Sequence, residues 1–220
     1  MSTKKPARSY PGLFVVLEGI DGAGTTTQTE RLARAVREDG YKVLTTRQPS
    51  DGPIGTLIRQ ALTGRFVLPE GAGPLNPQTL ALLFAADRVD HLEAQILPAL
   101  ERGEIVICDR YVLSSLAYQG ISLPTDWVQG INAFATPPDL TVFLQVDAAI
   151  AADRRADRGG NPELFEQDDQ QERIAKEYQA AIRARKGDKL VKVDGTLTPE
   201  KVTEAILKTL RPMIKKAAQG

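Results

Sequence analysis

The sequence predicts an α/β fold, in which five parallel strands form one sheet and helices cover both of its faces. Two observations lead to this prediction. Short apolar runs alternate with helical patterns along all 220 residues, and a glycine-rich segment joins the first apolar run to the first helical pattern. Parallel strands need helical crossovers between them, and such sheets bind ligands at the carboxyl ends of the strands. We therefore expect functional residues directly after the strands.

Five runs are expected to be strands because each is short, apolar and rich in β-branched residues. In chain order they are Leu13–Leu17, Lys42–Thr46, Ile105–Cys108, Leu140–Val146 and Leu190–Val193. Helices are expected between these runs, where apolar residues recur at three- and four-residue spacing. In chain order they are Thr26–Glu38, Ile54–Leu62, Pro77–Arg102, Ser114–Gln119, Asp126–Ala135, Ala148–Arg158, Gln167–Arg185 and Pro199–Leu210.

Local signals mark several of the helix ends. Asn76 provides a capping side chain just before Pro77 at the first helical position, and Thr198 precedes a proline in the same way. Gly40 ends the first helix, because glycine readily adopts the left-handed conformation found after a helix. Pro98 is expected to kink the long third helix, because proline lacks a backbone N–H.

Composition limits the classes of function. Lysine and arginine together number 28, as do aspartate and glutamate, so no net charge draws the chain to nucleic acid or to a membrane. Cys108 is the only cysteine, which excludes an intramolecular disulfide and suits a reducing cytoplasm, and there is no long apolar segment. With 42% apolar residues we expect one domain over 12–212, and frayed tails over 1–11 and 213–220.

The glycine-rich segment carries the most informative motif. It reads Gly19, Ile20, Asp21, Gly22, Ala23, Gly24, Thr25 and Thr26, which matches the phosphate loop G-x-x-x-x-G-K-[ST] except that Thr25 replaces the lysine. Converging backbone N–H groups and a helix N-terminus would bind nucleotide phosphates, as in ATP, and the Thr26 hydroxyl would contact Mg²⁺. A glycine turn that binds nothing is the less favoured alternative. The expected fold is thus a P-loop three-layer sandwich.

Asp109 and Arg110 follow the third predicted strand. In P-loop folds a carboxylate at this place lies beside the loop and can order Mg²⁺, so Asp109 is a candidate metal-binding residue. Arg110 is expected to point to the opposite side of the strand end. Without the neighbouring phosphate loop, a simple ion pair between the two residues would be the better interpretation.

Two further groups have more than one interpretation. Arg154, Arg155 and Arg158 either form a lid over a triphosphate, about residues 154–167, or complement the dipole of their helix. Phe84, Arg88 and His91 share a helix face. The alternative is a core phenylalanine with solvated arginine and histidine, and for His91 we favour this alternative. Trp127 and Phe134 are expected in the core.

These residues together resemble the thymidylate kinase family over about 13–210. The segments that carry the resemblance are Glu18–Gly24, Thr46–Pro49, Leu83–Arg88, Asp109–Tyr111, Ala117–Gly120 and Pro138–Leu140. Each is weak alone, but their order and spacing are specific. The resemblance implies transfer of the γ-phosphoryl group of MgATP to dTMP, giving dTDP for dTTP biosynthesis. It also implies a homodimer.

The resemblance assigns roles by position. Phe84 would stack on thymine, Arg88 would bond the base, and Tyr118 would exclude a 2′-hydroxyl. The residues expected to bind dTMP are Phe84, Arg88, Arg110, Ser114, Ser115, Tyr118 and Gln119. Arg110 would hold the acceptor phosphate, and Asp21 would reach the sugar 3′-hydroxyl or a metal-bound water. The expected catalytic residues are Asp21, Arg110, Arg154, Arg155 and Arg158.

Three positions depart from the family pattern. Thr25 replaces the loop lysine, Gln48 replaces a common glutamate, and Leu164 replaces a lid arginine. Our hypothesis is that a lid arginine, or a lysine from elsewhere in the dimer, replaces the missing charge. A nucleotide-binding module without activity and a kinase for another small acceptor are the alternatives. The acceptor residues argue against the first, because a pure ATP sensor does not need them.

Overall fold

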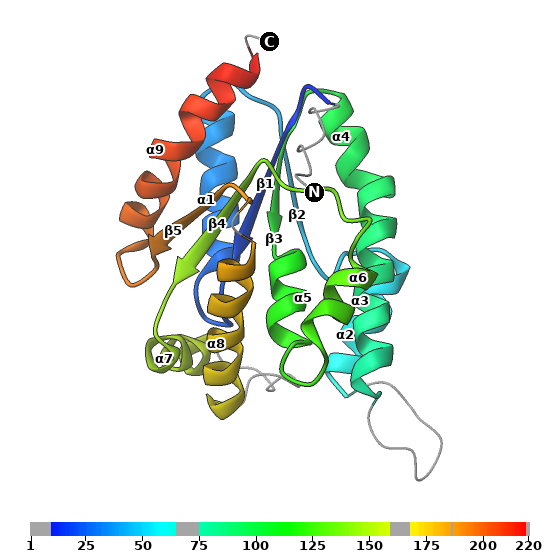
Figure 1. The fold of residues 1–220 in the computed structure, drawn as a ribbon. Helices are drawn as coiled ribbons and strands as arrows, with labels where there is room; N and C mark the ends of the chain where they lie inside the picture. The colour runs from blue at the N-terminus through cyan, green and yellow to red at the C-terminus, as the bar shows by residue number, and fades with distance from the viewer. Residues whose placement is uncertain (1–9, 65–74, 159–167, 186, 219–220) are drawn as a thin grey trace.

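The computed structural model describes residues 10–64, 75–158, 168–185 and 187–218, and its elements are labelled in Figure 1. Its strands are β1 (Leu13–Glu18), β2 (Val43–Arg47), β3 (Ile105–Asp109), β4 (Leu140–Gln145) and β5 (Leu190–Asp194). Its helices are α1 (Thr25–Glu38), α2 (Pro53–Leu62), α3 (Pro77–His91), the π-helical segment η1 (Leu92–Ile96), α4 (Leu97–Glu101), α5 (Val112–Tyr118), α6 (Thr125–Ile131), α7 (Ala148–Arg158), α8 (Asp168–Ala184) and α9 (Pro199–Ala218).

The strands form one parallel sheet in the order β2-β3-β1-β4-β5. Helices α1 and α9 lie side by side on one side of the sheet, and α3, η1 and α4 lie on the other (Figure 1). The predicted fold class is confirmed. Leu17 near the end of β1 pairs with Asp109 at the end of β3, so the phosphate loop and this carboxylate lie at the same edge of the sheet.

The central strands β1 and β3 are buried along their whole length, whereas β2 and β5 at the two edges are partly exposed. This burial explains why the central strands are continuous apolar runs without alternation. Cys108 in β3 is fully buried, and burial raises the pKa of its thiol well above the ordinary value. The single cysteine therefore belongs to the core and has little thiolate character.

The third and the last of the predicted helices differ in the structure. The third helix contains η1, in which the Leu97 N–H bonds the Leu92 carbonyl five residues back, just before Pro98. Because proline cannot donate the next backbone bond, the helix widens there and continues. Helix α9 continues past Leu210 to Ala218, so the predicted frayed tail is wrong for residues 213–218. Ile214 is buried one turn after Leu210 and extends the apolar face of the helix.

Two aromatic residues expected in the core lie at the surface. Helix α6 ends at Ile131 and not at Ala135, so Phe134 is not carried by the buried helix face and is 87% exposed. Trp127 in α6 is partly exposed, at 36%. The expected tail over residues 1–9 and the lid residues after Arg158 lie outside the described residues. Among the described residues, no helix is long and apolar enough to cross a membrane.

Candidate active site

The phosphate loop connects β1 to α1 through glycines in conformations that other residues rarely adopt. Gly22 has a φ of 89° and Gly24 a φ of 93°, both in the left-handed region. A Cβ atom on Gly22 would also lie 2.3 Å from the carbonyl oxygen of Ala151 in α7. The loop therefore packs directly against the backbone of α7, and this close approach leaves no room for a side chain at Gly22.

Thr25 and Thr26 point in different directions. Thr25, at the lysine position, is buried, whereas Thr26 is exposed and its Oγ1 donates to Asp109 Oδ2 at 2.5 Å. Asp109 Oδ1 is buried and has no hydrogen-bond partner among the described residues. A hydroxyl and an unpartnered carboxylate oxygen fit the oxygen-ligand preference of Mg²⁺, which usually takes further ligands from phosphates and water.

A large cleft opens over the phosphate loop. Its lining includes Asp21, Gly22, Gly24, Thr25 and Thr26 from the loop and start of α1, together with Asp109. Three guanidinium groups also line it, those of Arg47, Arg110 and Arg154. We call this the phosphate cleft. Its walls supply backbone donors, a candidate metal position and cations, which are the components that phosphoryl transfer requires.

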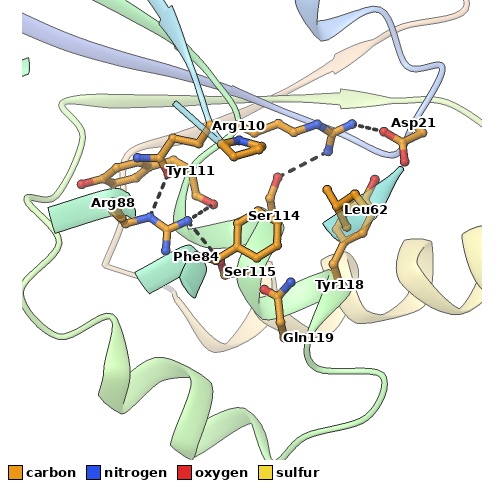
Figure 2. A pocket seen from close by; sticks show the side chains of 12 residues that line it. Asp21, Leu62, Phe84, Arg88, Arg110, Tyr111, Ser114, Ser115, Tyr118 and Gln119 are labelled. Atoms are coloured by element: carbon orange, nitrogen blue, oxygen red, sulfur yellow. Dashed lines mark hydrogen bonds and ion pairs between the residues drawn. The ribbon is translucent and has the colours of Figure 1, made fainter. Parts of the chain in front are cut away.

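A second cleft, the acceptor cleft, lies next to the first between α2, α3 and α5 (Figure 2). All seven residues predicted to bind dTMP line it: Phe84, Arg88, Arg110, Ser114, Ser115, Tyr118 and Gln119. Leu62, Tyr111, Pro49, Asp21 and Gln48 complete its lining. Asp21, Gln48 and Arg110 border both clefts, so the two clefts meet at these three side chains.

Arg88 is buried at the bottom of the acceptor cleft with 2% of its surface exposed. Its Nε donates to Gln48 Oε1 at 2.9 Å, and its Nη2 donates to the Tyr111 carbonyl at 3.1 Å and to Ser115 Oγ at 3.0 Å. Its Nη1 donates to Asn132 Oδ1. Burial lowers the pKa of Arg88, but four hydrogen bonds orient the guanidinium and leave one of its five N–H groups for a ligand.

Gln48 connects Arg88 to His91. Gln48 Nε2 lies 3.3 Å from His91 Nδ1, and His91 Nε2 lies 2.6 Å from Thr46 Oγ1. His91 is buried, and burial lowers its pKa, which fits a neutral ring that accepts from Gln48 at Nδ1. The expectation of a solvated His91 is therefore wrong. Its role could not be predicted from the sequence, because its partners Thr46 and Gln48 lie in β2 and directly after it, more than forty residues away.

Arg110 lies at the junction of the two clefts. Its Nη1 donates to the Gly19 carbonyl at 2.8 Å and its Nη2 to Asp21 Oδ1 at 2.6 Å, and the guanidinium lies over the Tyr118 ring at 5.3 Å (Figure 2). The backbone of Arg110 has a φ of 69°, a left-handed conformation that costs about 1–3 kcal/mol for a residue other than glycine. Arg110 and Asp109 both line the phosphate cleft, so the expectation that Arg110 points to the opposite side of the strand end stays a prediction.

Sequence reasoning missed the role of Glu18, which it used only as a family marker. Glu18 is fully buried at the end of β1, and burial raises its pKa. It accepts hydrogen bonds from the Tyr111 N–H at 2.9 Å, from Ser114 Oγ at 2.6 Å and from the Tyr178 hydroxyl at 3.1 Å. Glu18 thus anchors the start of α5. A carboxylate ending an otherwise apolar strand was the available signal.

The three predicted lid arginines have different positions. Arg154 lines the phosphate cleft, whereas Arg155 Nη1 donates to the Asp21 carbonyl at 2.7 Å and so contacts the loop backbone. Arg158 is the last residue of α7, and its side chain is outside the described part of the chain. Of the two described side chains, Arg154 is the one that reaches the cleft lined by Thr25.

Comparison with known proteins identifies the family of the chain. A sequence profile described as thymidylate kinase matches residues 17–206. The chain belongs to the thymidylate kinase family. It is 39% identical to a thymidylate kinase of Thermomicrobium roseum over 214 residues, 94% of this chain and 98% of the relative. A thymidylate kinase of Alkalilimnicola ehrlichii is 36% identical over 220 residues, 95% and 97% of the two chains. A probable thymidylate kinase of Pyrococcus abyssi is 46% identical over 156 residues, 70% and 74% of the two chains. The family predicted from the sequence is confirmed.

Proposed function

We propose that this protein transfers the γ-phosphoryl group of ATP to dTMP, forming dTDP and ADP for dTTP biosynthesis. The observation that carries the proposal is the acceptor cleft joined to a phosphate cleft. The phosphate loop takes the donor phosphates, and Arg110 at the junction takes the acceptor phosphate, because a guanidinium fits phosphate bidentately. A nucleotide-binding module without activity would need no acceptor cleft, and the comparisons do not favour that alternative.

The polar groups of the acceptor cleft suit thymine. Thymine presents a carbonyl acceptor at position 4 and an N–H donor at position 3. Arg88 has one remaining N–H, and Gln119 Oε1 is a buried acceptor without a partner among the described residues. The half-buried Phe84 ring borders the same space and provides a stacking surface. Cytosine presents an amino donor at position 4 and an acceptor at position 3. It would therefore place a donor against the Arg88 N–H and an acceptor against Gln119 Oε1.

A coupled assay of ADP release tests the proposal with dTMP, dUMP, dCMP and dGMP in parallel. We expect dTMP to exceed dCMP and dGMP by roughly tenfold to a hundredfold in kcat/KM, the discrimination that one well-placed base contact provides. ATP binding without transfer to any of the four acceptors would refute the proposed activity. A preference for dCMP or dGMP would retain the kinase and change the acceptor.

Mg²⁺ is the proposed metal, held on the protein side by Thr26 and Asp109. The unpartnered Asp109 Oδ1 supports this assignment. When bound, the metal would neutralise charge on the donor phosphates. No group of three or more histidine, cysteine, aspartate or glutamate side chains that could hold a metal occurs among the described residues, so most of its ligands would come from phosphate and water.

Arg154 is the proposed substitute for the loop lysine. It lines the phosphate cleft with Thr25, whereas the described Arg155 side chain is bonded to the loop carbonyl of Asp21. Arg47 lines the same cleft but forms an exposed ion pair with Asp51. Asp21 is proposed to meet the sugar 3′-hydroxyl or a metal-bound water, and Tyr118 to exclude a 2′-hydroxyl, as the resemblance implies.

A homodimer is also proposed, and the surface of α3 supports it. Leu82 and Val89 are exposed two turns apart on α3, at 50% and 43%, so they share one helix face. Leu82→Asp should shift the protein toward monomer in sedimentation velocity, and an unchanged sedimentation coefficient would place the interface elsewhere. The cytoplasmic location expected from the composition stays a prediction.

A further inference from the structure

Asp21 in the phosphate loop is held by two helices that lie far from it in the sequence. Its N–H donates to Gln171 Oε1 at 3.2 Å, and Gln171 Nε2 donates back to Asp21 Oδ2 at 3.2 Å. Arg155 in α7 donates to the Asp21 carbonyl at 2.7 Å. The backbone N–H, the backbone carbonyl and one carboxylate oxygen of Asp21 are thus each bonded to α7 or α8.

Gln171 is a specific choice for this contact. Its exposed fraction is 0%, so its amide needs partners for both its donor and its acceptor. A primary amide can accept from a backbone N–H and donate to a carboxylate of the same residue. Glutamate would keep the acceptor and lose the donor, and leucine would lose both.

The contact reaches the reacting groups through Asp21. The other carboxylate oxygen, Asp21 Oδ1, accepts from Arg110 Nη2 at 2.6 Å, and Arg110 borders both clefts. The Gly19 carbonyl holds Nη1 of this guanidinium, and the Asp21 carboxylate holds Nη2. A rotation of Asp21 would break the ion pair and leave Nη2 without this anchor.

We propose that Gln171 is a positioning residue of the phosphoryl transfer reaction: it fixes the Asp21 carboxylate, which orients Arg110 between donor and acceptor. This inference rests on the proposed role of Arg110 as the ligand of the acceptor phosphate. Gln171 itself lines neither cleft; it reaches them through Asp21 and through a side-chain contact with Tyr118, and the proposal concerns the contact with Asp21.

The first test is Gln171→Leu, with Gln170→Leu as the matched control on the same helix. Gln171→Leu should lower kcat/KM for dTMP about tenfold, the loss expected for two hydrogen bonds that orient a charged group, while KM for ATP changes by less than about twofold. Gln170→Leu should behave like the natural protein. A melting temperature measured for each variant separates this effect from a loss of stability.

The second test is a double-mutant cycle with Asp21→Ala. If Gln171 acts through Asp21, adding Gln171→Leu to Asp21→Ala should lower kcat/KM for dTMP by less than about a further twofold. Additive losses would overturn the proposal, as would equal increases in KM for ATP and dTMP. If Gln171→Leu is too unstable to assay, Gln171→Glu must show the same selective loss for dTMP. Failure of the natural protein with every acceptor would refute the proposed function, whereas an active protein with a silent Gln171→Leu would refute only the positioning role.

Discussion

The acceptor cleft and the phosphate cleft are built in different ways. At the bottom of the acceptor cleft, Arg88, Ser115 and Gln119 are all buried, and the guanidinium has four protein acceptors before any ligand arrives. In the phosphate cleft, Thr26 and Arg47 are exposed and the cations come from three separate elements. Base recognition is thus preorganised, whereas phosphate charge is met by side chains that keep contact with water.

The strongest test of the preorganised acceptor cleft is the substitution Arg88→Met. This change removes the cation and leaves Gln48, Asn132 and Ser115 without their donor. The base loses a charged donor, and Gln48 and Ser115 lose the partner that orients them. At about 1.5–3 kcal/mol for each hydrogen bond to a charged group, kcat/KM for dTMP should fall by roughly a thousandfold. Because Arg88 does not line the phosphate cleft, KM for ATP should stay within about twofold of the natural value. Steady-state kinetics with each substrate varied will measure this, and a comparable loss for ATP would remove the contrast.

The next largest effect is expected for Arg154→Ala. If Arg154 replaces the loop lysine, kcat should fall by about a hundredfold, as for the loss of one electrostatic donor in the transition state. Adding Thr25→Lys to Arg154→Ala should restore part of that loss. Arg47→Ala is the matched control, because it removes another guanidinium from the same cleft. A full rate in Arg154→Ala would show that the phosphate cleft obtains its charge elsewhere.

Phe84→Ala addresses the stacking surface of the acceptor cleft. Base stacking on an aromatic ring contributes about 1–3 kcal/mol, so the Kd for dTMP should rise by roughly tenfold to a hundredfold. Calorimetric titration with dTMP and with ATP measures the two affinities separately. Equal weakening of both nucleotides would contradict the assignment of Phe84 to the base.

The smallest expected effect belongs to Thr26→Ala in the phosphate cleft. Its hydroxyl contacts Asp109, and a metal there would keep phosphate and water ligands without it. The Mg²⁺ concentration for half-maximal rate should rise severalfold, with little change at saturating Mg²⁺. Thr27→Ala, one residue further along α1, serves as the control. An unchanged Mg²⁺ profile would place the metal away from Thr26.

The sequence predicted the sheet, the phosphate loop and Asp109, because strand and glycine-loop patterns are local and parallel topology brings strand ends together. The seven residues expected to bind dTMP came from the family resemblance, and all of them line the acceptor cleft. The sequence did not predict Glu18, Gln171 or His91 as parts of the site. Each of these acts through partners that are distant in the chain or lie on another element, as with Gln171 and Asp21. Ile214 was missed too, because the last helix was expected to end at about Leu210, whereas α9 continues through Pro212 to Ala218.

The close approach of Gly22 to Ala151 has a consequence for the modularity of the phosphate loop. The loop sequence is short and local, yet the loop also contacts α7, against which Gly22 packs and from which Arg155 donates to the Asp21 carbonyl. The same residues grafted between a strand and a helix of another protein would keep the motif and lose both contacts. In this protein, the eight loop residues are therefore not a complete structural unit. The unit also includes α7, a helix more than a hundred residues further along the chain.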